Sequence, residues 1–200
     1  PYAGGTHTAD VAVIRPVFVD GRLVAVAVAV AHWSEIGGAV PGSLPPDATE
    51  IFQEGLRLPG LRLCREDRLL EDVVDLVAAN VRLPRNCLAD LRAELAAVRI
   101  ADARIGEIAA RYGTDILLAA FRESLDHAEA VARAAVAALP DGRHEARDVI
   151  DGDGNTDEPI EVVVAVEIDG DTLTVDFTGC PPQRAAPINC TRGALVSRSE

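Results

Sequence analysis

Methionine is absent from this sequence of 200 residues, and aromatic residues make up only 4% of it. A core built on large rings is therefore excluded, and Val, Leu, Ile and Ala must fill the interior. Hydrophobic residues still reach 48% and charged residues 26%, a balance typical of globular proteins rather than disordered ones. A chain of this length forms one ordinary domain or two small ones.

Positive charge is scarce: the sequence has 19 Lys and Arg residues against 32 Asp and Glu residues, which gives a net charge of −13. Nucleic-acid binding requires clustered basic residues that displace counterions, so we expect no nucleic-acid partner. Long apolar runs are also lacking. The most apolar stretch, Leu23 to Ala31, is far shorter than the roughly 18–20 residues that span a bilayer, so we expect no membrane span.

The cysteines form no C-x-x-C pair and are widely spaced, and the sequence shows no signal-peptide pattern. This usage indicates reduced thiols in a cytoplasmic protein, without a disulfide framework or a zinc cage. We expect the four side chains to behave as small buried hydrophobic groups: Cys64, Cys87, Cys180 and Cys190.

Nucleotide-binding and hydrolase motifs are missing too. The sequence holds no Walker loop, no G-x-G-x-x-G after a strand and no G-x-S-x-G elbow. If ATP takes part in the reaction, another polypeptide or a part of the protein outside this sequence must bind it. The acidic run from Asp151 to Asp157 mimics a calcium loop, but Thr156 and Val162 stand where that loop needs Gly and Glu. We expect an acidic turn.

Two β-hairpins are predicted. Val11 to Val19 and Leu23 to Ala31 are β-branched runs on either side of Asp20-Gly21, a strong hairpin signal. The unbroken apolarity of the second run predicts a strand covered on both faces. A second pair of strands is expected between Ile160 and Phe177, with its turn at Asp169-Gly170.

Helical periodicity lies between the hairpins, over Glu71 to Val81, Asn86 to Arg111 and Thr114 to about Leu139, with Thr114 as the N-cap of the last helix. The sequence therefore predicts an α+β fold in which antiparallel hairpins flank a helical segment. We divide it into residues 1–70 (hairpin and Gly/Pro-rich loop), 71–140 (helices) and 141–200 (second hairpin).

Metal-ligand residue types stand at both ends of the first hairpin. His7 and Asp10 precede its first strand and His32 ends its second, and an antiparallel turn brings these ends together. Two imidazoles and a carboxylate suit Zn, Mn or Fe(II), which can activate water or polarise a carbonyl. Hydrogen-bonded surface histidines are the alternative. His127 and His144 have no carboxylate at ligand spacing and are expected to be structural.

The loop after His32 runs through SEIGGAVPGSLPP, and glycine-rich loops of this kind can present backbone N–H groups to an oxyanion. We expect Gly37, Gly38 and Ser43 to bind substrate. Glu50 and Glu54 would share a face if Thr49 caps a helical turn, and such a pair can divide acid and base catalysis. A solvated helix face is the alternative.

Five blocks, in order along nearly the whole chain, resemble the hydantoinase B/5-oxoprolinase family, which includes acetone carboxylase large subunits. The five blocks are PYAGGTHTADVAVIRPVF, AHWSEIGGAVPGSLPPDATEIFQEGLRL, DLRAELAAVRIADARIGEIAARYG, ALPDGRHEARDVIDGDG and VDFTGCPPQRAAPIN. The first two of these are the most specific. The chain departs from the family pattern at Trp33, Glu35 and Glu94, where relatives often carry His, Asp and Gln. These departures leave the metal set intact and bear on the substrate.

The resemblance implies a divalent metal on His7, Asp10 and His32, with a further ligand before residue 1, in a larger multi-domain subunit of which this chain is an internal fragment. It also implies that ATP and Mg are bound by a partner subunit of the hydantoinase A type, and hence a hetero-oligomer, or by a fused domain. The implied reaction is ATP-dependent opening of a cyclic amide, such as a hydantoin, 5-oxoproline or a lactam. Alternatives are ATP-dependent carboxylation of a ketone such as acetone, and an inactive folding or assembly module.

Overall fold

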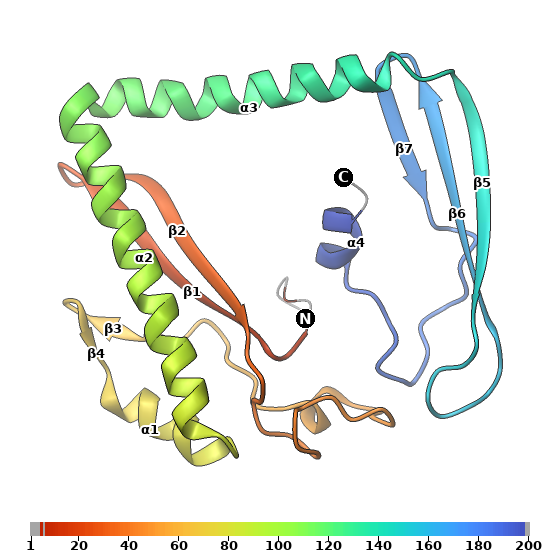
Figure 1. Ribbon diagram of the computed structural model, residues 1–200, viewed down its shortest axis with the longest axis horizontal. Coiled ribbons are helices and arrows are strands. Elements are labelled where there is room, and N and C mark those ends of the chain that lie inside the picture. Colours follow the sequence, from red (N-terminus) through yellow and green to blue (C-terminus); the bar gives the residue numbers. More distant parts are fainter. Residues whose placement is uncertain (1–4, 6, 199–200) are drawn as a thin grey trace. The chain divides into compact units, whose positions relative to one another are not determined.

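The structure is a computed structural model that describes residue 5 and residues 7–198 (Figure 1). Residues 1–4 and 6, which belong to the first family-like block, lie outside the described part. The chain divides into two compact units. The first extends to Glu107 and includes Ala185–Arg198, and the second is Ile108–Arg184. The division falls within a long helix, and each unit is described by itself.

The first unit begins with the hairpin formed by β1 (Asp10–Val19) and β2 (Arg22–His32). Asp20 and Gly21 have φ angles of 49° and 76°, and this pair of positive values is what a two-residue type I′ turn requires. The predicted hairpin and its turn are confirmed. The antiparallel register pairs Asp10 with His32 at the open end.

The two faces of this hairpin differ in burial. Val13, Val17 and Val24 are buried on one face. The other face is apolar and exposed among the described residues: Ile14, Phe18, Val26, Val28 and Val30. The prediction that both faces of the second strand are covered is wrong for this chain, because unbroken apolarity shows only that a strand can be covered twice.

Two helices and two short strands follow the loop after the hairpin. α1 spans Glu71–Asn80, α2 spans Pro84–Tyr112, and the short strands β3 (Cys64–Arg65) and β4 (Arg68–Leu69) precede them. Proline suits the first helical position because its missing N–H has no partner there. The buried stripe of α2 includes Leu91, Leu95 and Val98, as the periodicity predicts.

A charged cluster ties α2 to β1. The Arg15 guanidinium donates to the Asp102 carboxylate on α2 at 2.7 Å and also pairs with Asp67 between β3 and β4. Arg99 on α2 donates to the Asp67 carbonyl at 2.7 Å. These bonds, together with the apolar stripe, position α2 against the hairpin.

The second unit contains α3 (Thr114–Val136) and an antiparallel sheet in the order β5 (Gly142–Ile150), β6 (Ile160–Asp169) and β7 (Thr172–Asp176). The predicted pair corresponds to β6 and β7, but Asp169 pairs with Thr172, so the turn residues are Gly170 and Asp171. The N-cap of α3 is Gly113, not Thr114. Strand β5 was not predicted, since its charged, wholly exposed sequence has no alternating apolar face.

Smaller elements complete the described chain: a 3₁₀ turn over Ile51–Gln53, called η1, and α4 over Arg192–Arg198. No helix among the described residues is long and apolar enough to cross a membrane. Of the cysteines, only Cys87 is fully buried, and Cys190 is exposed. The expectation that all four are buried is therefore wrong, because the segments that carry the others lie at the surface.

Candidate metal centre

The turn before β1 is held against the end of β2 by backbone hydrogen bonds. The Asp10 N–H donates to the His7 carbonyl at 3.1 Å, and the Trp33 N–H donates to the Ala9 carbonyl at 2.9 Å. With Asp10 paired to His32 in the ladder, this arrangement fixes the backbone of three potential ligands. The predicted convergence of His7, Asp10 and His32 is present.

The three side chains contact one another through the Asp10 carboxylate. Oδ1 lies 2.8 Å from His32 Nδ1, and Oδ2 lies 3.1 Å from His7 Nδ1. Oδ2 also accepts the His7 backbone N–H at 3.0 Å. The two rings stand edge to face with centroids 5.4 Å apart. One ligand atom from each residue lies within 4.8 Å of the others, so a single ion can reach all three.

Asp10 is held as an ionised carboxylate. Partial burial raises its pKa, but hydrogen bonds from the His7 backbone and from the His32 and His7 side chains together lower that pKa below the ordinary value. A lowered pKa keeps the negative charge available at mildly acidic pH. The site thus combines a persistent anion with two imidazoles that solvent can reach.

The separations of 2.8 and 3.1 Å between the Asp10 oxygens and the imidazole nitrogens are hydrogen-bond distances. The fit to a metal therefore rests on the proximity of the three side chains and on the chemistry of their donor atoms. The donor set of nitrogen and oxygen suits Zn, Mn or Fe(II).

Of the predicted acidic pair Glu50 and Glu54, Glu54 is hydrogen-bonded to the turn that carries the candidate ligands. Its Oε2 accepts a hydrogen bond of 2.9 Å from the Thr8 hydroxyl, within the turn between His7 and Asp10. Glu50 and Glu54 stand at the two ends of η1, and Glu50 has extended backbone angles. The expected shared helix face is therefore wrong: a single 3₁₀ turn separates them, and Thr49 is not its cap.

The predicted substrate-binding loop lies just beyond His32 and Trp33. Its Gly37 N–H donates to the Glu35 carboxylate at 2.6 Å, and the Ser43 hydroxyl donates to the Gly37 carbonyl at 2.7 Å. Gly37 and Gly38 both have positive φ angles, of 86° and 84°. These internal bonds shape the loop, and the role of Gly37, Gly38 and Ser43 toward substrate stays a prediction.

A family model described as Hydantoinase B/oxoprolinase matches residues 1–199. The chain belongs to the hydantoinase B/oxoprolinase family. It is 36% identical over 94% of its length to a putative D-/L-hydantoinase subunit from a Pseudomonas species (strain NS671). It is 34% identical over 97% of its length to the acetophenone carboxylase delta subunit of Aromatoleum aromaticum.

The fold of this hydantoinase B/oxoprolinase chain matches a solved relative. The crystal structure of the ATP-dependent caprolactamase from Pseudomonas jessenii superposes on 96% of the chain with a TM-score of 0.89 and 34% identity. The α+β fold class is confirmed. The chain spans 33% of the hydantoinase subunit, 29% of the carboxylase subunit and 33% of that caprolactamase chain.

Two residues that depart from the family pattern meet behind the centre. The Trp33 indole, 1% exposed, donates to Glu94 Oε2 on α2 at 3.1 Å. Glu94 is 5% exposed, and its Oε1 has no hydrogen-bond partner among the described residues. Burial raises the pKa of Glu94, and hydrogen bonds from Trp33 and the Ala31 backbone offset this only in part. The sequence identifies Glu94 only as a departure from the family pattern and does not indicate its partner.

We expect Glu94→Gln to stabilise the protein at neutral and alkaline pH. A carboxyl whose pKa is raised on folding contributes its stability below the unfolded value and loses it as pH rises through the folded value. Glutamine does not titrate, so the variant should be more stable than the wild type by about 1 kcal/mol or more at pH 8, because it has no buried carboxyl to ionise. The two proteins should converge toward pH 4.

Thermal unfolding of both proteins between pH 4 and pH 8 measures this difference. Glu123→Gln on the exposed surface of α3 is the matched control and should follow the wild type at every pH. Parallel stability curves for Glu94→Gln and the wild type would show that Glu94 is not the source of the pH dependence.

Proposed function

We propose that this chain forms the metal-binding part of a subunit of an ATP-dependent cyclic amide hydrolase. The convergence of His7, Asp10 and His32 at one end of the β1–β2 hairpin carries the proposal. Similarity to a hydantoinase subunit and to a caprolactamase supports it, because both names refer to cyclic amides. The substrate class is a ring amide: a hydantoin, 5-oxoproline or a lactam.

His7, Asp10 and His32 would hold the metal, with a further ligand supplied from outside this chain. A divalent metal supplies a Lewis acid that polarises a carbonyl or lowers the pKa of water. Asp10 adds charge and orients both rings through its two oxygens.

Glu54 is our proposed acid–base residue. The Thr8 hydroxyl occupies one of its oxygens at 2.9 Å, which holds the carboxylate beside the metal-binding turn and leaves the other oxygen to exchange a proton. A positioned carboxyl of this kind can take a proton from water and return it to the leaving amide nitrogen. Glu50, at the other end of η1, is a second candidate. Gly37, Gly38 and Ser43 shape the adjacent substrate loop.

ATP binding is assigned to a partner subunit, with a fused domain as the alternative. The caprolactamase to which the chain is similar is ATP-dependent, and no Walker or G-x-G-x-x-G motif stands in the 200 residues. We infer a hetero-oligomer in which a subunit of the hydantoinase A type binds ATP and Mg. Activation of the amide oxygen would take place there, and ring opening would take place at the centre described above.

A substrate screen of the complex reconstituted with a hydantoinase A-type subunit tests the proposal. Phosphate release and ring-opened product should rise together with a hydantoin, 5-oxoproline or caprolactam. Both should disappear when metal is removed by chelation and return when it is restored. A complex that retains stoichiometric metal yet opens none of these rings would overturn the cyclic amide assignment.

Ketone carboxylation is the second candidate, and the similarity to the acetophenone carboxylase delta subunit favours it. In that case ATP turnover would require both a ketone, such as acetone, and bicarbonate. The product would be a β-keto acid rather than an amino acid or a carbamoyl acid. The same screen therefore separates the two reactions by the co-substrate that ATP turnover requires.

A further inference from the structure

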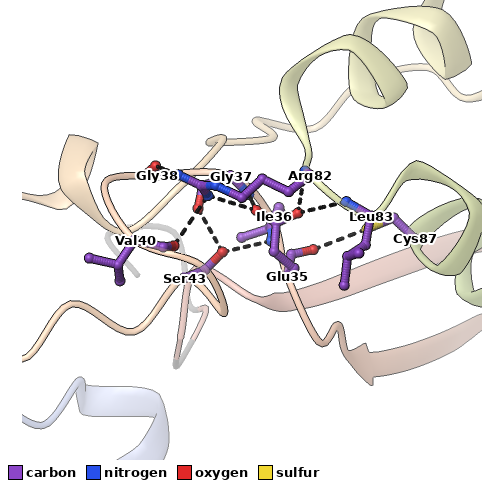
Figure 2. Close-up of polar contacts among 9 residues, drawn as sticks. All are labelled: Glu35, Ile36, Gly37, Gly38, Val40, Ser43, Arg82, Leu83 and Cys87. Atoms are coloured by element: carbon purple, nitrogen blue, oxygen red, sulfur yellow. Dashed lines mark hydrogen bonds and ion pairs between the residues drawn. The ribbon is translucent and has the colours of Figure 1, made fainter.

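Beyond His32 the chain enters a buried polar network around Glu35 (Figure 2). Glu35 is 1% exposed. Its carboxylate accepts the backbone N–H groups of Gly37 at 2.6 Å, Arg82 at 2.7 Å and Leu83 at 3.4 Å. Burial raises the pKa of Glu35, but these bonds and the Arg82 side chain together lower that pKa below its ordinary value. The network therefore has an ionised carboxylate at its centre.

Arg82 links this carboxylate to the loop. It lies in the extended connection between α1 and α2, and its guanidinium donates to Glu35 Oε1 at 3.1 Å. The same group donates to the carbonyls of Gly38 at 2.8 Å and Val40 at 3.2 Å. A planar guanidinium can donate to several acceptors at fixed angles, which a lysine ammonium cannot reproduce. All of these bonds go to the loop and not to the metal ligands.

Other bonds close the network on both sides. The Ser43 hydroxyl accepts the Ile36 N–H at 2.7 Å and donates to the Gly37 carbonyl at 2.7 Å. The Cys87 thiol donates to the Glu35 carbonyl at 3.1 Å. Neither a strand ladder nor a helix holds residues 36–43, so these side-chain bonds contribute strongly to the path of the loop.

The loop is connected in turn to the candidate acid–base residue. The Ala39 N–H donates to the Gln53 carbonyl at 2.7 Å, and the Leu56 N–H donates to the Ile36 carbonyl at 2.8 Å. Glu54 lies between these two attachment points and contacts Thr8 in the metal-binding turn. Moving the loop would therefore move the backbone that carries Glu54.

We propose that Arg82 is a positioning residue that fixes residues 36–43 and thereby places Glu54 beside the metal-binding turn. Its catalytic consequence rests on the proposed function, whereas its effect on the loop does not. Glu35 is its buried counter-ion, and Arg82 acts without touching the metal ligands. Loss of Arg82 should leave metal binding intact while it loosens the loop and slows the reaction.

Hydrogen exchange of the metal-loaded protein tests the effect on the loop. In Arg82→Ala, the amides of residues 37–43 should exchange at least about tenfold faster than in the wild type, the rate rising as the free energy of local opening falls. Amides of β1 and β2 and the bound metal should stay within about twofold. Arg85→Ala, an exposed arginine three residues further on, is the control and should change neither.

Turnover by the reconstituted complex tests the catalytic consequence. Arg82→Ala should lower kcat by about 10- to 100-fold with KM within about threefold, as expected when a reacting group is misplaced while substrate binding is preserved. Methylguanidinium should restore part of kcat in Arg82→Ala. It should have no effect on Arg85→Ala.

Each result decides the proposal. Unchanged exchange in the loop would overturn it, as would faster exchange with wild-type kcat. Loss of metal in parallel with kcat would also overturn it, because Arg82 would then support the whole centre. Should Arg82→Ala fail to fold, loop exchange, bound metal and kcat are compared between Arg82→Lys and the wild type instead. If the wild-type complex turns over none of the substrates, the proposed function has failed, while the exchange result still decides the effect on the loop.

Discussion

Asp10→Asn should reduce bound divalent metal from about one ion per chain to a small fraction of that value, with affinity falling at least about 100-fold. Asparagine keeps the size of the side chain but removes the negative charge. It also removes one of the two oxygens that now face His7 and His32. Elemental analysis and a competition titration with a chelator measure the loss. His7→Ala and His32→Ala should give losses of similar size.

Matched controls separate ligand loss from a general effect of the substitutions. The control variants are Asp75→Asn and His127→Ala. Asp75 is exposed on α1, and His127 is exposed on α3. Both should retain the metal content and affinity of the wild type. Undiminished stoichiometric metal in Asp10→Asn, with the protein still folded, would contradict the assignment of the centre.

Gly38→Ala should destabilise the protein strongly and abolish turnover by the complex. At a φ of +84°, an added Cβ would stand 2.5 Å from the Gln53 carbonyl oxygen and 2.8 Å from backbone atoms of Glu54 and Gly55. A backbone clash cannot be relieved by a change of rotamer. We expect a loss of about 3 kcal/mol or more in the free energy of unfolding, above the roughly 1–2 kcal/mol of left-handed backbone cost alone.

Gly42→Ala measures the cost of the left-handed backbone conformation without a steric clash. Gly42 has nearly the same φ, +83°, but an added Cβ there would meet nothing within 4 Å. Denaturant unfolding should therefore show a loss of only about 1–2 kcal/mol. Equal losses in the two variants would mean that close packing of Gly38 against the 53–55 segment does not constrain the loop.

The convergence of His7, Asp10 and His32 could be predicted because local rules place these residues. Asp20 and Gly21 determine the turn, the turn determines the register, and the register sets Asp10 opposite His32. None of these features depends on a contact between distant segments. The helices after residue 70 could be predicted for the same reason, since their periodicity and Pro84 are local signals.

Local sequence signals do not predict the roles of Arg82 and Glu94 or the presence of β5. Arg82 reaches the loop across more than 40 positions of sequence, and a lone arginine between two helices is typical of a solvated side chain. Glu94 occupies a position on the buried stripe, but nothing local indicates that Trp33 faces it. The charged strand β5 is fixed by pairing with β6, and edge pairing leaves no periodic signal in the sequence.

Trp33 provides the most direct test of the metal centre. It is the one tryptophan of the sequence, follows His32 and is 1% exposed, so free ions in solution reach it poorly, whereas a Co²⁺ ion bound through the neighbouring residue His32 should quench it. Titration of metal-free protein with Co²⁺ should quench Trp33 fluorescence to an endpoint near about one equivalent, and Asp10→Asn should abolish that endpoint. Fluorescence that responds identically in the wild type and Asp10→Asn would contradict a metal centre at His7, Asp10 and His32.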